Sequence, residues 1–506
     1  MAIHPGEERI AGSLTARADV VHPTSWFVQD LDERLSVESV ALLTDGGAKA
    51  LPFERRGGQI WTDLERTRQP GERLTVRVRY GGTPREAPRP PWDGGFTWTE
   101  TPGGEPWIAS SVQVNGADLW WPTKDHPSDE PDSMALSFTV PRPLVAASNG
   151  RLRRVEDNGE ARTYHWFVST PINNYGVALN VAPYRTVDTT YASTSGTDIP
   201  VTFWVVPAHY QQAEKRLPQF LDHLRFYEET LGPYPFRADK YGIAETPHLG
   251  MEHQTIIAYG SDFSNNEFGF DYLHHHELGH EWWGNLVTAA DWSDFWLHEG
   301  FCTYMQALYA EELGGREAYH SYLQGSRGGI NNEQPVAPRG SRSTLEMYYL
   351  PSGEGDGDIY SKGAWILHSL RHLVGDEAFF EALRRMANPR PELRRATDGR
   401  QCRFATTDDF LRIAEAASGR ELDWFFEVYL RQPALPRLVT ERSGDELRLR
   451  WDAPEELSFP MPVPVRVGGE TRRVKMKGGE GRLALPNADA EVQVDRKNWI
   501  LKANGG

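Results

Sequence analysis

The segment formed by residues 271–304 constrains the fold of this chain more than any other stretch. It contains the pattern H-E-x-x-H from His276 to His280, and eighteen residues separate His280 from Glu299. On an α-helix, residues four apart lie on the same face, one turn above the other. The two imidazoles can therefore meet at one point, at the Zn–N distance of about 2.0–2.1 Å. The pattern predicts a helix that carries two ligands of one metal ion.

Two glutamates complete the pattern. Glu299 is the candidate third ligand, and three protein ligands leave a fourth position open, as in catalytic zinc sites. Glu277 lies next to the first ligand, where it can act as a general base on a water at the metal. H-E-x-x-H alone arises by chance in helical proteins, and Glu299 at this spacing is what favours zinc. His274 and His275 have no histidine four residues on, so we interpret them as ordinary helix-start residues.

The chain has 506 residues, which is too long for one core, and we predict three domains. Apolar and polar residues alternate in stretches such as 74–80, which predicts an antiparallel β domain over residues 1–188. Helical spacing then predicts a mixed domain over residues 189–435. Strand-like stretches return near the end and predict a small β-sandwich-like module over residues 436–506.

Helix signals in the middle part give more specific predictions. A helix is expected up to Leu231, with Pro218 as a candidate start. Gly314-Gly315 should end the helix that begins near Glu299, and Thr407 should cap a later one. The other predictions are a long loop over 323–358 and helices over 360–373 and 422–430.

Composition excludes some classes of protein. The net charge of −17 argues against a nucleic-acid-binding surface, which would be basic. No run of eighteen apolar residues is present, so we expect no membrane span. The N-terminus lacks the features of a signal peptide, and Cys302 and Cys402 are the only cysteines, as in a reducing compartment. We expect a cytoplasmic protein, although a secreted chain whose leader has been removed would look the same.

Motifs outside the zinc pattern carry a family resemblance. Residues 250–253 (GMEH) are similar to a G-x-M-E-N motif, and residues 360–364 (YSKGA) match Y-x-K-G. Residues 113–127 resemble a segment that ends in W/F-P-x-x-D-x-P, and residues 226–235 resemble the stretch before an active-site strand. In this order, with the zinc pattern, the motifs resemble the gluzincin zinc aminopeptidases, the family of aminopeptidase N and leukotriene hydrolase.

The resemblance implies a multidomain α+β fold. An N-terminal antiparallel β domain would precede a thermolysin-like α/β catalytic domain and the small C-terminal β module. Familiar members continue into a large helical domain that covers the active site, and this chain ends after the β module. We therefore expect a compact form with a more open site, in which peptide length restricts cleavage less.

The resemblance also implies roles for single residues. One zinc ion per chain would be held by His276, His280 and Glu299, with Glu277 as the catalytic base and Tyr360 on the oxyanion. The implied substrate-binding residues are Glu252, Gln113, Gly250 and Met251, of which Glu252 and Gln113 would bind the α-ammonium group of the peptide.

Some positions leave alternatives open or depart from the family pattern. By position alone, a tyrosine at a helix start is usually a packing residue, and Tyr348 and Tyr349 compete with Tyr360 for its role. The family's Asn is His253 here, its leading Gly is Leu249, and His298 stands where Asn is common. We interpret both of these histidines as structural.

We therefore predict a zinc metalloaminopeptidase that acts on peptides with a free N-terminus and releases hydrophobic or basic residues. Two alternatives remain: a thermolysin-type endopeptidase and a catalytically inactive relative that serves as a scaffold. Nothing in the chain singles out an epoxide hydrolase activity like that of leukotriene hydrolase. The sequence does not decide the oligomeric state, for which a monomer is the working expectation.

Overall fold

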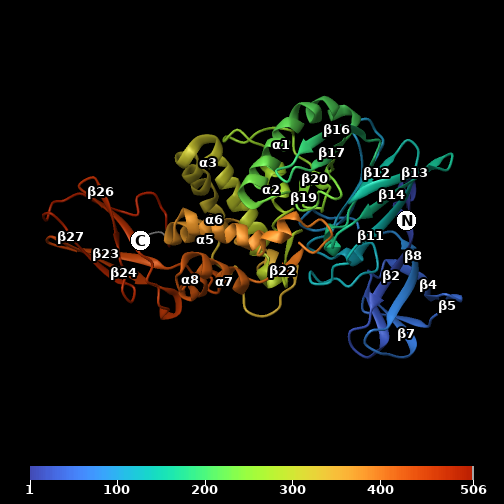
Figure 1. Cartoon of the computed structure of the whole chain (residues 1–506), viewed down its shortest axis with the longest axis horizontal. Helices are drawn as coiled ribbons and strands as arrows, with labels where there is room; N and C mark the ends of the chain where they lie inside the picture. Colours follow the sequence, from blue (N-terminus) through green and yellow to red (C-terminus); the bar gives the residue numbers. More distant parts are fainter. Residues whose placement is uncertain (504–506) are drawn as a thin grey trace. The chain divides into compact units, whose positions relative to one another are not determined.

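The computed structural model describes residues 1–503, and its packing divides the chain into two units. Unit 1 comprises Met1–Arg225, Tyr234–Ser264 and Ala396–Cys402. Unit 2 comprises Phe226–Pro233, Asn265–Arg395 and the chain from Arg403 onward. The predicted order along the chain, a β-rich part followed by a mixed part and a β-rich end, is confirmed (Figure 1). The boundaries after residues 188 and 435 stay predictions.

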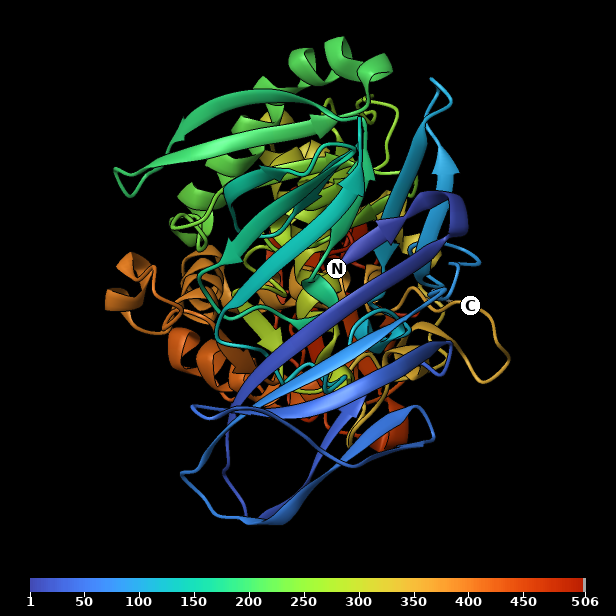
Figure 2. The same cartoon turned by 90° about the vertical axis from the view of Figure 1, so that its right-hand side faces the viewer.

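Unit 1 begins with an eight-stranded sheet in the order β13-β14-β11-β1-β2-β8-β4-β5. Its strands are β1 (Ala2–His4), β2 (Arg9–Asp19), β4 (Leu35–Thr44), β5 (Gly47–Ala50), β8 (Arg73–Gly82), β11 (Met134–Pro141), β13 (Arg151–Asp157) and β14 (Ala161–Val168). In β8 every second side chain from Leu74 to Tyr80 is buried, as the alternating sequence predicts. All neighbours pair antiparallel except β1 and β11, which pair in parallel. The long blue strands of this sheet are seen in Figure 2.

Two smaller sheets complete the β-rich part. One has the order β12-β15-β10-β9, with strands Val145–Ser148, Leu179–Ala182, Pro106–Ser111 and Gly95–Glu100. The other has the order β3-β7-β6, with strands Thr24–Asp30, Gln59–Arg68 and Phe53–Arg56. The chain leaves β10 just before Gln113, so a buried sheet places this predicted substrate-binding residue.

A five-stranded sheet follows in the order β16-β17-β18-β20-β19, with strands Arg185–Ala192, Asp198–Val205, Tyr241–Glu245, Ile257–Tyr259 and Gly250–Met251. Helix α1 (Tyr210–Leu231) connects the parallel strands β17 and β18. Phe220 of α1 packs on Phe203 and Tyr259, with ring centroids 6.0 and 5.3 Å apart. Pro218 as the helix start is wrong, because α1 begins two turns earlier and this proline lies inside it on the exposed face. Burial of the apolar face outweighs the one helical hydrogen bond that the proline removes.

Unit 2 carries most of the helices, together with the parallel strands β21 (Val287–Ala289) and β22 (Arg403–Ala405). The helices are α2 (Tyr272–Gly279), α3 (Trp296–Ser326), α4 (Thr344–Tyr348), α5 (Ser361–Val374), α6 (Asp376–Ala387), α7 (Thr407–Ser418) and α8 (Asp423–Leu430). Short 3-10 turns occur in both units at Pro5–Glu7, Ala117–Leu119, Asn174–Gly176, Pro207–His209, Trp292–Asp294, Arg327–Gly329, Pro391–Arg395 and Pro454–Glu456.

Three helix boundaries differ from the sequence prediction. Helix α3 starts at Trp296, one turn before Glu299, because the chain already turns at Trp292–Asp294. Gly315 interrupts α3 with φ 72°, as predicted, but the helix resumes and runs to Ser326. The cap of α7 is Thr406 rather than Thr407, since the Thr406 side chain accepts from the Asp409 N–H in a capping box.

Helices α3 and α5 cross in backbone contact at two glycines. A Cβ atom added to Gly363 of α5 would lie 2.9 Å from the Cα atom of Gly300 in α3. A Cβ atom added to Gly300 would in turn lie 3.0 Å from the Gly363 Cα atom. Gly300 follows Glu299, and Gly363 follows Tyr360 by one helical turn, so this crossing fixes the spacing of two predicted site residues.

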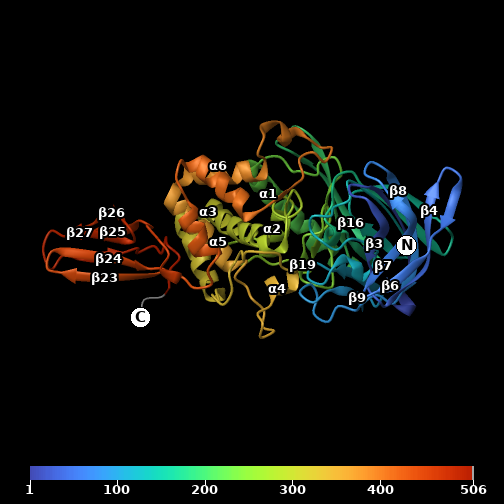
Figure 3. The same ribbon diagram turned by 90° about the horizontal axis from the view of Figure 1, so that it is seen from below.

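The C-terminal strands of unit 2 form two three-stranded sheets, drawn in red in Figure 3. The sheet β23-β24-β27 has strands Arg437–Ser443, Glu446–Asp452 and Glu480–Ala484, and the sheet β26-β25-β28 has strands Glu470–Val474, Val463–Val467 and Val492–Val494. After β28 the chain returns to α5: the Leu501 N–H donates to the Ser369 hydroxyl at 2.9 Å, and Trp499 stacks on His368. Among residues 1–503, no helix is long and apolar enough to cross a membrane.

Candidate active site

Helix α2 carries the H-E-x-x-H pattern in unit 2. Its N-cap, Asp271, accepts from the His274 N–H at 3.1 Å, and His280 is the C-cap with helical backbone angles. His276 and His280 therefore keep helical spacing although the helix has only eight residues. Gly279 has no room for a side chain, since an added Cβ atom would lie 2.4 Å from the Tyr227 hydroxyl.

Three donor atoms converge beside α2. The Nε2 atoms of His276 and His280 lie 3.2 Å apart, and the Glu299 Oε2 atom lies 3.2 and 3.4 Å from them. Ligands that bind zinc tetrahedrally at about 2.0–2.1 Å lie about 3.3–3.4 Å from one another. The spacing of the three atoms therefore fits one zinc ion with a fourth position left for another ligand.

Hydrogen bonds and burial favour the protonation states in which these side chains bind a metal. The His280 Nδ1 atom donates to the Trp283 carbonyl at 2.8 Å, which leaves the lone pair on Nε2. Burial lowers the pKa of His276, which favours the neutral, ligating imidazole. Burial by itself would raise the pKa of Glu299, but the adjacent His280 and His276 outweigh it and hold this pKa well below its usual value.

Glu277 is buried close to His280, one of the three donor residues. One of its carboxylate oxygens lies within 4.8 Å of a ring nitrogen of His280. A carboxylate in this position is close enough to exchange a proton with a water molecule that approaches the same point. The two preceding histidines, His274 and His275, lie in the first turn of α2 and are buried, and His275 packs on Tyr309 with ring centroids 4.7 Å apart.

Two tyrosines lie on the other side of Glu299. The Tyr348 hydroxyl donates to Glu299 Oε1 at 3.2 Å and lies 2.8 Å from the Tyr360 hydroxyl. Tyr360 is the N-cap of α5, and its ring stacks on His276 with centroids 6.0 Å apart. From the sequence, Tyr348 is only an alternative to Tyr360 for the contact with the oxyanion. A capping box at Ser343 signals the start of α4, but no spacing rule points from Tyr348 to Glu299.

The predicted ammonium-binding residues belong to unit 1. The Gln113 amide donates to Glu252 Oε1, and both side chains are buried. Gly250 and Met251 form β19, directly before Glu252. Carboxylate and amide oxygens both accept hydrogen bonds, and these two side chains follow strands of two different sheets.

The histidines at the departures from the family pattern are both buried. His298 accepts the Ala289 N–H at its Nε2 atom, at 2.8 Å, and thereby holds β21 beside α3. Burial lowers the pKa of His298 and of His253 to about 3, so both rings are neutral. No signal in the sequence predicts the His298 contact, which depends on a strand nine residues away.

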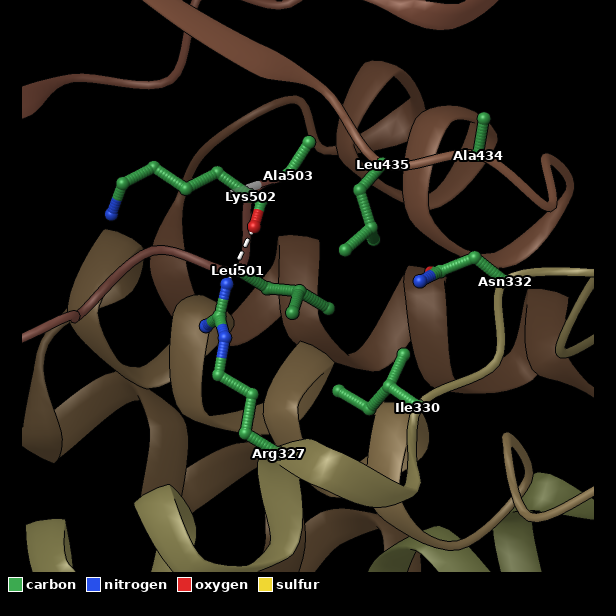
Figure 4. A pocket seen from close by; sticks show the side chains of 8 residues that line it. All are labelled: Arg327, Ile330, Asn332, Ala434, Leu435, Leu501, Lys502 and Ala503. Carbon is green, nitrogen blue, oxygen red and sulfur yellow. Dashed lines mark hydrogen bonds between the residues drawn. The ribbon is translucent and has the colours of Figure 1, made fainter. Parts of the chain in front are cut away.

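A cavity of about 390 Å³ lies elsewhere in unit 2 (Figure 4). It is lined by Arg327, Ile330, Asn332, Ala434, Leu435, Leu501, Lys502 and Ala503. Arg327 donates to the Lys502 carbonyl at 2.5 Å across one side of it. None of the predicted site residues lines this cavity, so it is separate from the cluster at α2.

Comparison with known proteins agrees with the geometry at α2. Residues 223–429 match the model of the peptidase family M1 domain. This matched segment is the part of the chain that resembles peptidase family M1. The predicted relationship to the gluzincin aminopeptidases is thereby confirmed, and the matched segment contains all three converging donor residues.

Individual relatives of this chain are distant. It is 26% identical over 396 residues to aminopeptidase N of Streptomyces lividans, which covers 73% of the chain and 43% of the relative. It is 25% identical over 327 residues to human endoplasmic reticulum aminopeptidase 1, covering 60% of the chain and 33% of the relative. The chain therefore spans less than half the length of these curated relatives.

A solved structure matches more of the chain. The M1 zinc metallopeptidase of Deinococcus radiodurans superposes with a TM-score of 0.69 at 25% identity, covering 86% of this chain and 92% of that one. The predicted α+β fold class is confirmed by this likeness. Zinc is the metal of that neighbour, in agreement with the two imidazoles and one carboxylate at α2.

Proposed function

We propose that this protein is a zinc-dependent aminopeptidase that hydrolyses the N-terminal bond of peptides and releases hydrophobic or basic residues. The observation that carries the proposal is the convergence of His276 Nε2, His280 Nε2 and Glu299 Oε2 within 3.2–3.4 Å of one another. The match of residues 223–429 to the peptidase family M1 domain and the likeness to aminopeptidases support it.

The donor set fits zinc by number, type and spacing. His276, His280 and Glu299 would hold one ion per chain. When bound, zinc supplies Lewis acidity, which polarises a peptide carbonyl and makes water a better nucleophile. His280 and Glu299 are buried and His276 is half-buried, which strengthens the charge interactions there because little water screens them.

Glu277 would be the catalytic base. It would take a proton from the attacking water and later give it to the leaving amine, which must be protonated before it departs. Its carboxylate is buried, only 7% exposed, and lies within 4.8 Å of His280. This proximity supports the proposal that Glu277 is the base.

Tyr360 would donate its hydroxyl hydrogen to the substrate oxygen on which negative charge develops. A donor aimed at that oxygen lowers the barrier because its interaction grows as the charge grows. Support comes from the Tyr360 hydroxyl, which lies 2.8 Å from the Tyr348 hydroxyl, itself bonded to Glu299. Tyr360 is thereby connected to the metal-binding carboxylate through one side chain.

Glu252 and Gln113 would bind the α-ammonium group of the substrate. An ammonium group carries three donors and pairs well with one carboxylate and one amide oxygen. Binding the free end fixes the register of the peptide, so that only its first bond reaches the base. Gly250 and Met251 would contact the first residue of the substrate.

A panel of aminoacyl-fluorophore substrates tests the proposal, with each substrate also supplied in N-acetylated form. We expect cleavage of the free-amine substrates, loss of cleavage with a chelator and recovery with added zinc. Equal cleavage of the acetylated substrates would instead support the thermolysin-type endopeptidase. No cleavage of any substrate by zinc-loaded protein would support the inactive scaffold.

The location of the protein and its assembly are also part of the proposal. We place it in the cytoplasm as a monomer, and Cys302 and Cys402, which form no disulfide bond, support a reducing compartment. Fractionation of the source cells and light scattering of the purified protein test these two statements.

A further inference from the structure

A chain of hydrogen bonds starts at the candidate ligand Glu299 and includes a residue that no motif contains. Tyr348, the last residue of α4, donates its hydroxyl hydrogen to Glu299 Oε1 at 3.2 Å. The same hydroxyl lies 2.8 Å from the hydroxyl of Tyr360. Tyr348 is buried, only 6% exposed, so water does not replace these bonds easily.

The direction of this chain follows from counting hydrogens. A phenol has one hydrogen to donate and two lone pairs that accept. Because Tyr348 gives its hydrogen to the Glu299 carboxylate, its oxygen can only accept from Tyr360. The bonds therefore run from Tyr360 to Tyr348 and from Tyr348 to Glu299. A charged acceptor at the end strengthens the chain.

The same bond decides which oxygen of Glu299 faces the metal position. Tyr348 holds Oε1, while Oε2 lies 3.2 and 3.4 Å from the ring nitrogens of His276 and His280. Without the tyrosine hydroxyl, the carboxylate could rotate and present either oxygen or both. Partners of metal ligands commonly fix ligand orientation in this way.

The position of Tyr348 is itself well determined. Helix α4 starts with a capping box between Ser343 and Glu346, and the Asp356 N–H donates to the Tyr348 carbonyl at 2.8 Å. The Tyr348 ring packs edge-on against Phe295, with centroids 5.3 Å apart. Phe295 is the N-cap of α3, the helix whose first turn carries Glu299. The tyrosine and the carboxylate are thus supported by the same short segment.

We propose that Tyr348 is a positioning residue with two connected tasks, and the inference rests on the proposed aminopeptidase function. It orients Glu299 so that one oxygen faces the metal, and it holds the Tyr360 hydroxyl in a resting position. When a substrate carbonyl arrives, the Tyr360 hydroxyl turns its hydrogen from Tyr348 to the substrate oxygen. No bond to hydrogen is broken in this exchange of hydrogen-bond partners.

The substitution Tyr348→Phe removes only the hydroxyl and keeps the ring against Phe295. We expect zinc affinity, measured by competition with a chromogenic chelator, to fall about 10-fold to 100-fold, the usual range for such partners. At saturating zinc, kcat should fall at least about 10-fold, while KM changes less than about twofold. The neighbouring substitution Tyr349→Phe removes the same group from the next residue of the chain; it is the control and should change neither quantity.

A double-mutant cycle separates positioning from general support of the fold. In a Tyr360→Phe background, Tyr348→Phe should lower kcat by less than about twofold, because the hydroxyl that it positions is gone, yet zinc affinity should still fall. Equal kcat losses in both backgrounds, or unchanged zinc affinity and kcat in an active parent, would overturn the inference. An inactive parent would refute the proposed function instead, and the zinc-affinity measurement would still decide the orientation of Glu299.

Discussion

Replacing Gly363 by alanine tests whether the α3–α5 crossing holds the site together. The added Cβ atom would lie 2.9 Å from the Gly300 Cα atom, whereas ordinary contacts begin at 3.4 Å. The clash is with backbone, so no side chain can turn away. The two helices must therefore separate by at least about 0.5 Å, which moves Glu299 relative to Tyr360.

Both stability and activity should respond to this shift. Overpacking of a close-packed interior costs about 1–3 kcal/mol, and we expect the free energy of unfolding of Gly363→Ala to fall by about that amount. A misplacement of about 1 Å can cost about 100-fold in rate, so a shift of about half that size should lower kcat about 10-fold. Urea unfolding and the aminoacyl-fluorophore assay measure the two effects.

Gly325 provides a matched control on α3. An alanine Cβ atom there would have no neighbour within 4 Å, and the backbone angles are helical. Gly325→Ala should therefore leave kcat unchanged and the protein equally or slightly more stable. If Gly363→Ala matched this control in both stability and kcat, the crossing would not position the site, and the reasoning would be refuted.

Three further predictions follow from the site and the buried histidines. Glu277→Gln should keep about one zinc per chain by metal analysis and lose several orders of magnitude in kcat; loss of the metal would make Glu277 a ligand. Glu252→Ala should raise KM for free-amine peptides, and an unchanged KM would exclude Glu252 from ammonium binding. Burial lowers the pKa of His223, His253 and His298 to about 3, against 6.5 for an exposed histidine. The unfolded chain therefore binds more protons below about pH 6.5, and urea unfolding should show stability falling from pH 7 to 5, by about 2 kcal/mol per histidine. A flat profile would mean that these rings are not buried and neutral.

The core of the site was predictable because local geometry determines it. Helical spacing alone brings His276 and His280 to one point, and the pattern includes Glu299 on the next helix. The strands of unit 1 were also predictable, since alternation along β8 directly reflects one buried face. In each case a short stretch of sequence carries the signal, either helical spacing or alternation along a strand.

Contacts between distant segments account for what sequence reasoning missed. Tyr348 meets Glu299 across 49 residues, and the Gly300–Gly363 contact spans 63 residues, so no periodicity connects either pair. Pro218 misled the assignment of α1 because propensity favours a start at proline, while packing of the helix on the five-stranded sheet extends it further back. The parallel pairing of β1 with β11 likewise depends on contacts between distant segments of the chain.

Anomalous diffraction at the zinc edge, from crystals of the purified protein, tests the central claim most directly. We expect one strong peak per chain, about 2.0–2.2 Å from His276 Nε2, His280 Nε2 and a carboxylate oxygen of Glu299. A peak bound by other residues, or no peak at these three atoms with zinc in excess, would contradict the account.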